Sequence, residues 1–283
     1  MSAPAVSTYL NMDLGDIHYL EQSNEDKDLL ILFHPYGKDA KFALKHFSFL
    51  KDYFHLIALD LPYHGKTKIH KSHLSPSDIS NILNELLVRN KNKNFYILGH
   101  SFGARLACIA CSDAKQAAQK TVFYGPELGT TRYTKIFINA FTYKVFKLPA
   151  KLFLSTRLTT LISRMAYKLK LIDSIAYDFM ILQQEAQSRA DLMSLWKTLA
   201  LSNKRLQNFK KNPANLGKAI VFFGSKDRTT PIGYYKKSKW NIPSIELTGG
   251  HFSITQQTKN KIKEFEKQAI DNLIKMNILW EKS

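Results

Sequence analysis

A single serine lies between two glycines in the segment Gly99-His100-Ser101-Phe102-Gly103. An apolar run precedes this segment and an alanine-rich run follows it, so the serine stands where a strand ends and a helix begins. A serine on such a sharp turn is strained, and we expect Gly99 and Gly103 because the positions two before and two after it approach each other. The turn would hold the hydroxyl clear of the sheet, as a nucleophile requires. The alternative is an ordinary turn that contains a serine.

A nucleophilic serine needs a base that takes its proton and an acid that orients the base. His251 is the best candidate for the base, because it follows the last predicted strand and a glycine pair that allows its loop to turn inward. The other histidines have simpler structural interpretations, and His18 belongs to an early strand. His100 is an elbow residue, too close in sequence to Ser101 to act as its base.

The orienting acid is expected at the end of another strand. Asp227 follows the apolar run 218–224 and gives the order Ser101, Asp227, His251, which is the chain order expected for this kind of elbow. Glu127, which follows the apolar run 120–125, is the alternative acid. Asp227 also has a structural interpretation, because an aspartate before Arg-Thr-Thr-Pro commonly caps a turn.

An attacked acyl carbonyl develops negative charge on its oxygen, and backbone N–H groups stabilise that charge. The Phe102 N–H, at the start of the predicted helix, is one expected donor. The second is expected in the loop His34–Asp39, where Pro35 has no N–H and Tyr36 is the best candidate. We expect His34 to shape this loop by hydrogen bonding and not to act as the base.

Elements of regular structure must position these residues, and the apolar runs that precede them read as strands. Expected strands cover 29–33, 54–60, 94–99, 120–125, 218–224 and 244–249, after an N-terminal strand pair that turns at 13–16. Expected helices cover 74–90, 103–116 and 259–280, with Ser77 or Asp78 as the cap of the first. Continuous apolar strands that alternate with helices predict an α/β fold with a mainly parallel central sheet flanked by helices.

The segment 128–211 interrupts this alternation, because its pattern is helical throughout. It falls between two predicted strands of the sheet. We therefore interpret it as an inserted helical cap on a core made of residues 1–127 and 212–283.

The formal net charge is +18, and part of it is concentrated in the predicted cap. The stretch 132–170 contains lysine and arginine interleaved with aromatic residues and has no aspartate or glutamate. Three interpretations stay open: solvated cations on a cap whose apolar face covers the active site, attraction to an anionic membrane surface, and recruitment of an acidic small substrate. No recognised motif accompanies the charge, so we do not expect nucleic-acid binding.

Two cysteines, Cys108 and Cys111, lie in the predicted helix after Ser101, where we expect them to pack in the core. No metal-binding spacing and no phosphate-binding glycine loop is visible, so we expect no metal and no cofactor. The low cysteine content and the absence of a signal-peptide pattern predict a cytoplasmic protein, with attachment at the membrane surface as the further hypothesis raised by the cap.

Five short motifs occur in order along the chain: HPYG, DLPYHGKT, GHSFG, GSKDRTTP and GGHF. With them the chain resembles the α/β-hydrolase fold proteins of the helical-capped branch, which includes esterases, lipases and meta-cleavage-product hydrolases. The resemblance extends from Ile17 to Trp280, outside the variable cap. Two departures exist, since the family usually has glycine where this chain has Pro35 and where it has Tyr63.

The residues and the resemblance together predict a serine hydrolase that cleaves a carboxylic ester with an apolar or lipid-like acyl group. The same triad also serves acyltransferases and hydrolases of C–C or amide bonds. A non-catalytic protein that uses the basic cap at a membrane surface is a further alternative. A small-molecule acyl ester is the expected substrate.

Overall fold

The computed structural model describes residues 4–91, 93–128, 143–145, 160–161, 164–165, 167–169, 189–227 and 229–251. The predicted helix 259–280 and most of the basic stretch 132–170 lie outside these residues. The inserted cap therefore stays a prediction over most of its length.

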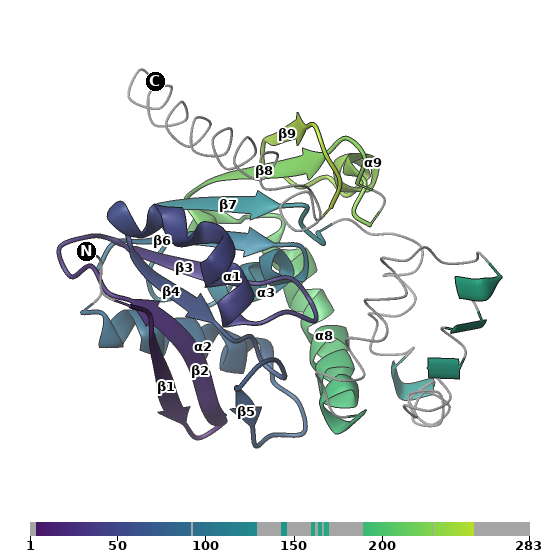
Figure 1. Cartoon of the computed structure of the whole chain (residues 1–283). Helices are drawn as coiled ribbons and strands as arrows, with labels where there is room; N and C mark the ends of the chain where they lie inside the picture. The colour runs from purple at the N-terminus through teal and green to yellow at the C-terminus, as the bar shows by residue number, and fades with distance from the viewer. Residues whose placement is uncertain are drawn as a thin grey trace.

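A nine-stranded sheet forms the centre of the molecule (Figure 1). Its strands are β1 (Val6–Met12), β2 (Gly15–Gln22), β3 (Leu29–Phe33), β4 (His55–Leu59), β5 (Lys68–Ile69), β6 (Phe95–His100), β7 (Lys120–Tyr124), β8 (Lys218–Gly224) and β9 (Ser244–Leu247). Their spatial order is β1-β2-β4-β3-β6-β7-β8-β9, with β5 beside β2. The pairs from β4 to β9 are parallel, and the pairs made by β2 are antiparallel. The predicted fold class is confirmed.

Helices cover both faces of this sheet. They are α1 (Ala40–Phe47), α2 (Pro76–Arg89), α3 (Phe102–Cys111), α8 (Arg189–Phe209) and α9 (Ile232–Lys237), with short 3-10 turns at Ser48–Asp52 and Ala214–Leu216. Alternate residues of β3 enter separate apolar clusters, one with α1 and the other with α2, α3 and α8. Every residue of β3 and β4 is buried, which explains why these strands are continuously apolar.

The helix α2 begins one residue before the expected cap position Ser77. The Ser75 hydroxyl accepts the Asp78 N–H at 3.1 Å, and the Asp78 carboxylate accepts the Ser75 N–H at 2.8 Å. The prediction of Ser77 or Asp78 as the cap is wrong, because Pro76 fits the first helical position and Ser75 supplies the cap before it. The sequence patterns give no prediction for α1 or α9, which are short.

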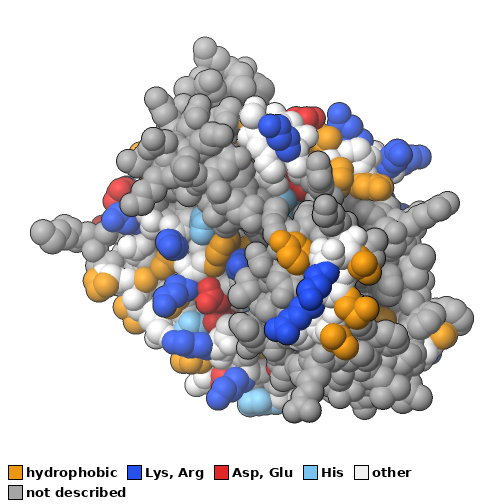
Figure 2. All heavy atoms as spheres, turned by 45° about the vertical axis from the view of Figure 1, so that its right-hand side comes forward, with side chains coloured by type: hydrophobic (Ala, Val, Ile, Leu, Met, Phe, Trp, Pro, Cys, Tyr) orange, Lys and Arg blue, Asp and Glu red, His pale blue; other side chains and the backbone are white. Residues whose placement is uncertain are grey.

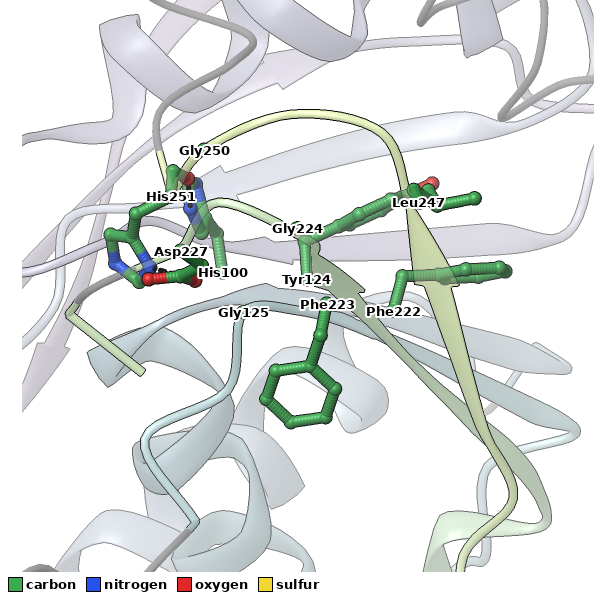
Figure 3. A pocket seen from close by; sticks show the side chains of 10 residues that line it. All are labelled: His100, Tyr124, Gly125, Phe222, Phe223, Gly224, Asp227, Leu247, Gly250 and His251. Atoms are coloured by element: carbon green, nitrogen blue, oxygen red, sulfur yellow. Dashed lines mark hydrogen bonds and ion pairs between the residues drawn. The ribbon is translucent and has the colours of Figure 1, made fainter. Parts of the chain in front are cut away.

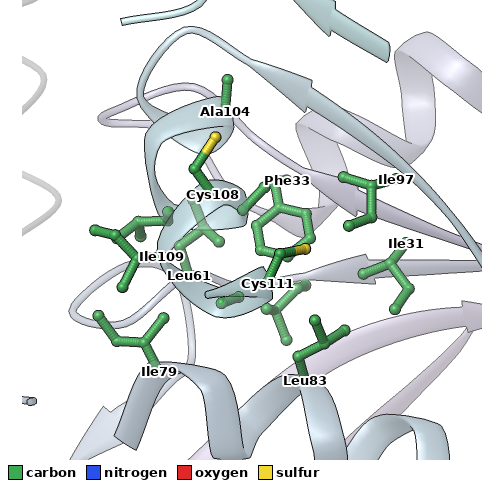
Figure 4. Packing of buried hydrophobic residues seen from close by; sticks show 14 of the residues in the cluster. Ile31, Phe33, Leu61, Ile79, Leu83, Ile97, Ala104, Cys108, Ile109 and Cys111 are labelled. Carbon is green, nitrogen blue, oxygen red and sulfur yellow. The ribbon is translucent and has the colours of Figure 1, made fainter. Parts of the chain in front are cut away.

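The two cysteines belong to α3, and their side chains lie in the apolar core of the protein (Figure 4). Cys108 and Cys111 are both free thiols and fully buried. Burial raises the pKa of both thiols, so they stay protonated and pack as small apolar groups. The predicted core role of this pair is confirmed.

The C-terminal end of the inserted segment is part of the packed core. Leu206 and Phe209 of α8 are buried in the apolar cluster that contains α2 and α3, and Figure 1 shows α8 beside α3. Within the described residues, no helix is long and apolar enough to span a membrane. The same residues contain no group of three or more side chains suited to hold a metal ion.

Candidate active site

Ser101 occupies the turn between β6 and α3. Its backbone has φ 54° and ψ −116°, a left-handed conformation that a residue with a side chain adopts only under strain. The Ser101 N–H donates to the Tyr124 carbonyl of β7 at 2.9 Å, which fixes the turn to the sheet. The sharp turn predicted from the sequence is therefore present, with Ser101 at its apex.

The glycines two before and two after Ser101 leave room for close approaches of the backbone, as expected from the sequence. A Cβ on Gly103 would lie 2.3 Å from the Phe33 carbonyl oxygen at the end of β3. A Cβ on Gly99 would lie 2.9 Å from the Ala104 Cα. At Gly99 the obstructing backbone is that of Ala104, the residue directly after Gly103, in line with the expected close approach of the positions two before and two after Ser101. Gly103 in addition leaves room for the end of β3. Gly103 allows α3 to start directly against the loop that follows β3.

Three side chains from separate loops form a continuous hydrogen-bonded chain. His251 Nε2 lies 2.9 Å from Ser101 Oγ, and His251 Nδ1 lies 2.7 Å from Asp227 Oδ2. Figure 3 shows the Asp227 carboxylate and the His251 imidazole next to each other after β8 and β9. Because the carboxylate accepts the Nδ1–H, the opposite nitrogen of the ring carries a lone pair and accepts the Ser101 hydroxyl. The structure thus brings together all three residues expected for a triad.

Asp227 caps a turn and orients His251 at the same time. Its Oδ1 accepts the Thr229 N–H at 2.8 Å and the Thr230 N–H at 2.9 Å, while Oδ2 faces His251. Burial acts to raise the pKa of this carboxyl, but hydrogen bonds from His251 and Thr230 outweigh burial and lower it. The carboxylate is therefore ionised near neutral pH.

Thr230 and Gly125 also shape the site, and the sequence did not single them out. Thr230 Oγ1 lies 2.9 Å from Asp227 Oδ2, 3.1 Å from His251 Nδ1 and 3.0 Å from the Gly125 carbonyl oxygen. Gly125 has φ 46°, and a Cβ there would stand 2.9 Å from His251 Nδ1. The signal for Gly125 was its place directly after a strand, whereas nothing distinguished Thr230 from its neighbours.

His100 supports the loop that carries His251. Its Nε2 donates to the His251 carbonyl oxygen at 3.1 Å, and the two ring centroids are 5.3 Å apart. Burial, followed by the nearby His251, lowers the pKa of His100 to about 3. The ring is therefore neutral.

His100, Asp227 and His251 also line the small hollow of Figure 3.

Glu127, the alternative acid, does not lie beside the His251 Nδ1, because Asp227 occupies that place. Its backbone N–H donates to the Ser101 carbonyl at 3.1 Å. Its carboxylate lies 3.7 Å from Arg105 Nη2. The Glu127 backbone is thus close to Ser101, and its side chain is paired with Arg105.

The two expected oxyanion donors belong to neighbouring segments. The Phe102 N–H opens α3 and donates to no residue among those the structure describes. The rings of Tyr36 and Phe102 pack edge to face with centroids 5.3 Å apart. The role of the Tyr36 N–H stays a prediction.

His34 shapes the loop after β3, as expected from the sequence. Its Nδ1 donates to the Pro35 carbonyl at 2.8 Å, and its Nε2 accepts the Leu61 N–H at 3.0 Å. Burial lowers the pKa of this ring well below its usual range, so His34 stays neutral and joins the loops after β3 and β4.

Comparison with known proteins places this architecture among related folds. The family model for the α/β hydrolase fold matches residues 29–256. No curated protein shows significant sequence similarity to the chain.

Several solved structures have a similar fold at low sequence identity. A hydrolase from Pseudomonas aeruginosa PA01 superposes with a TM-score of 0.69 at 16% identity, over 94% of this chain and 98% of that one. A structure from a study of carboxylesterases of Nitrososphaera gargenis gives 0.64 at 16% identity, over 95% and 99% of the two chains. An enol-lactonase from Burkholderia xenovorans LB400 gives 0.69 at 12% identity, over 94% and 100%.

Proposed function

The chain belongs to the α/β hydrolase fold family, and it is a hydrolase; we propose that it cleaves a carboxylic ester through a catalytic triad of Ser101, His251 and Asp227. The observation that carries this proposal is the unbroken hydrogen-bonded chain from the Asp227 carboxylate through His251 to a serine on a strained turn. Nucleophile, base and orienting acid then each have the partner that their role requires.

The reaction begins when His251 Nε2 takes the Ser101 proton and Ser101 Oγ attacks the acyl carbonyl carbon. The N–H groups of Phe102 and Tyr36 stabilise the resulting oxyanion, and the positive end of α3 adds to this stabilisation. His251 then donates the proton to the leaving alkoxide, and the acyl group stays on Ser101. Water, deprotonated by His251, attacks the acyl-enzyme and releases the acid.

The substrate that we propose is an ester of a small molecule with an apolar or lipid-like acyl group. The rings of Tyr36 and Phe102 pack together beside the nucleophile and support an apolar contact there. Carboxylesterase and lactonase activities, named for two of the structurally similar proteins, both act on esters. Transfer of the acyl group to an alcohol or thiol, and cleavage of a C–C or amide bond, use the same triad and stay alternatives.

Labelling with a fluorophosphonate probe tests the proposal. Wild-type protein should react at Ser101, and Ser101→Ala should not, while both give the same circular dichroism spectrum. Turnover of p-nitrophenyl esters of increasing chain length then measures the acyl preference, and added alcohol or thiol reveals any transfer product. Folded wild-type protein that neither labels nor cleaves any ester would contradict the proposal.

A second proposal concerns an anionic membrane surface as a partner, with the protein in the cytoplasm and attached peripherally. It rests on the few described residues of the predicted cap, where four apolar side chains and three cations are all exposed. They are Val145, Leu161, Met165 and Leu169, together with Lys144, Arg164 and Lys168. Figure 2 shows a face of the molecule on which hydrophobic and basic side chains lie next to one another. Such a surface suits the interface of an anionic bilayer.

Co-sedimentation with vesicles tests this second proposal. Binding to vesicles with anionic lipid should exceed binding to neutral vesicles and should fall with added salt. A variant with glutamate at Lys144, Arg164 and Lys168 should lose the difference while it keeps esterase activity. Equal, negligible binding to both kinds of vesicle would contradict the proposal.

A further inference from the structure

Arg105 is a buried cation one helical turn after Ser101. Its side chain is only 4% exposed, and its Nε atom is fully buried without a hydrogen-bond partner. No hydrogen bond joins the guanidinium to any residue in the part of the chain that the structure describes. A guanidinium carries five N–H donors, so this one is far from satisfied.

An arginine with a purely structural role in a protein interior is expected to bind a carboxylate through two parallel hydrogen bonds. The nearest carboxylate, that of Glu127, lies 3.7 Å from Arg105 Nη2, which is beyond hydrogen-bond distance. The Glu127 side chain is 25% exposed, so solvent reaches part of it. Glu127 therefore neutralises the charge of Arg105 but accepts no hydrogen bond from its N–H groups.

This cation lies in the neighbourhood of the proposed chemistry. Glu127, which pairs with Arg105, donates its backbone N–H to the Ser101 carbonyl at 3.1 Å. Burial raises the pKa of the Tyr36 hydroxyl, and the nearby charge of Glu127 raises it further. The Tyr36 ring in turn packs on Phe102, the residue after the nucleophile. One side of Ser101 is therefore surrounded by three neighbouring side chains, those of Arg105, Glu127 and Tyr36.

We propose that Arg105 binds a free carboxylate carried by the substrate, so that the preferred esters are monoesters of dicarboxylic acids. This inference rests on the proposed esterase function and narrows its substrate class. A carboxylate would accept two parallel hydrogen bonds from the two terminal nitrogens of the guanidinium, the paired geometry that arginine offers and lysine does not. In the free enzyme the Glu127 carboxylate neutralises the charge of Arg105, and it competes with the substrate carboxylate for the guanidinium. The net charge of +18 attracts anionic substrates over longer distances.

Paired substrates test the inference. One is 4-nitrophenyl hydrogen glutarate, which carries a carboxylate, and the other is 4-nitrophenyl pentanoate, a neutral ester of similar length. Wild-type protein should prefer the charged ester in kcat/KM. Arg105→Met should lower kcat/KM for the charged ester roughly 10- to 100-fold, the value of a hydrogen bond to a charged group, and leave the neutral ester within about threefold.

Two further variants separate substrate binding from a structural role. Glu127→Gln should raise kcat/KM for the charged ester, because it removes the competing carboxylate, whereas a structural ion pair predicts a loss in both variants. Arg89→Met, which removes an exposed arginine of α2, is the matched control and should change neither ester. The melting temperature of Arg105→Met should not fall, because it replaces a buried cation without hydrogen bonds.

The outcomes distinguish this inference from the proposed function. Equal losses for both esters in Arg105→Met, or no preference in the wild type, would overturn the carboxylate site while esterase activity stands. Absence of probe labelling and of turnover on either ester would overturn the proposed function itself. Calorimetric binding of glutarate still tests Arg105 in that event, since it should bind the wild type and not Arg105→Met, and equal binding would reject the site.

Discussion

Among the residues that the structure describes, two hydrogen-bonded chains each join a serine, a histidine and an aspartate. The elbow triad is Ser101, His251 and Asp227, and the strand triad is Ser7, His18 and Asp60. The distances are alike: histidine to aspartate is 2.7 Å in both, and serine to histidine is 2.9 Å in the elbow triad and 2.7 Å in the strand triad. Side-chain connectivity therefore does not distinguish them.

The backbone that carries each serine does distinguish them. Ser101 has φ 54° and directly precedes α3, so the first N–H of a helix lies beside its hydroxyl. Ser7 lies within β1, where it pairs with Leu20 of β2 in regular antiparallel register. Ser7 is followed by further residues of β1 and not by a helix, so its own segment offers no helix N-terminus to an oxyanion. The comparison teaches that the elbow, and not the triad alone, makes a serine a candidate nucleophile.

The two aspartates also differ in what they hold. Besides His18, the Asp60 carboxylate accepts the backbone N–H groups of Ala40, at the start of α1, and of Lys66, in the loop after β4. The link from Asp60 to His18 was not predicted from the sequence. The strand triad thus joins β1, β2, α1 and this loop, which is a structural task.

The largest expected difference separates the two serines. Ser101→Ala should lower kcat on a p-nitrophenyl ester on the order of 10⁴- to 10⁶-fold, because it removes the nucleophile. Ser7→Ala should change kcat/KM less than twofold, since it removes only an exposed hydroxyl from a strand. Steady-state kinetics on both purified variants measures the contrast. A large loss of activity in Ser7→Ala with an unchanged fold would show that the strand triad takes part in the reaction.

Replacing the two aspartates should affect different properties, catalysis for Asp227 and stability for Asp60. Asp227→Asn should lower kcat about 10⁴-fold, because an amide favours the wrong tautomer of His251, and the loss of stability should be the smaller effect. Asp60→Asn should instead lower the free energy of unfolding by roughly 3 kcal/mol, because a buried charged acceptor is removed from several donors. Urea unfolding and ester kinetics, measured on both variants, separate these effects. An Asp60→Asn variant that is stable but inactive would contradict the structural role of Asp60.

The difference between the two triads also explains which features of the structure could be predicted from the sequence. The parallel strands and the elbow triad were predictable, because continuous apolar runs identify buried strands and each triad residue follows one of them. The strand triad was not, since Ser7 and His18 meet only through the register of a hairpin. Which backbone N–H groups a buried aspartate accepts likewise depends on tertiary structure.

Arg105 shows a similar limit. Its helix has small apolar residues on all sides, which indicates packing and not binding, and the lack of hydrogen bonds is visible only in three dimensions. Thr230 could not be chosen over Thr229 for the same reason. Sequence patterns identify which element carries a residue more reliably than which atoms it meets.

A buried histidine beside each triad predicts a loss of stability in acid. Burial lowers the pKa of His64 to about 4 and that of His100 to about 3, from the usual histidine value of 6.5. Between these values and pH 6.5 the unfolded chain binds more protons than the folded one, so stability rises with pH across this window and falls as pH drops through it. Each histidine contributes about 1.4 kcal/mol per pH unit.

His64→Asn tests this linkage outside the elbow triad, because an amide can still donate to the Pro62 carbonyl that His64 Nδ1 binds. The difference in unfolding free energy between pH 7 and pH 5 should be about 2 kcal/mol smaller in this variant than in the wild type. Urea titrations at the two pH values measure it. An unchanged difference would mean that the pKa of His64 is the same in the folded and the unfolded protein.

The smallest expected effect concerns Tyr63, the family departure that the sequence left unexplained. Like Ser101, it has a positive φ, at 64°, and its side chain is buried. Its hydroxyl lies 3.5 Å from Thr198 Oγ1 of α8, which also accepts the Leu74 N–H, so Tyr63 connects the loop after β4 to α8. The strain at Ser101 positions the proposed nucleophile, whereas the strain at Tyr63 places a packing side chain.

Tyr63→Phe keeps the ring in place and removes only the hydroxyl, whose contact with Thr198 is long. It should lower the free energy of unfolding by less than about 1 kcal/mol and leave kcat/KM unchanged. Thr198→Val, which also removes the acceptor of the Leu74 N–H, should cost more stability than Tyr63→Phe. A fall in kcat/KM in Tyr63→Phe at unchanged stability would instead place its hydroxyl against the substrate, and the two strained residues would then serve one site.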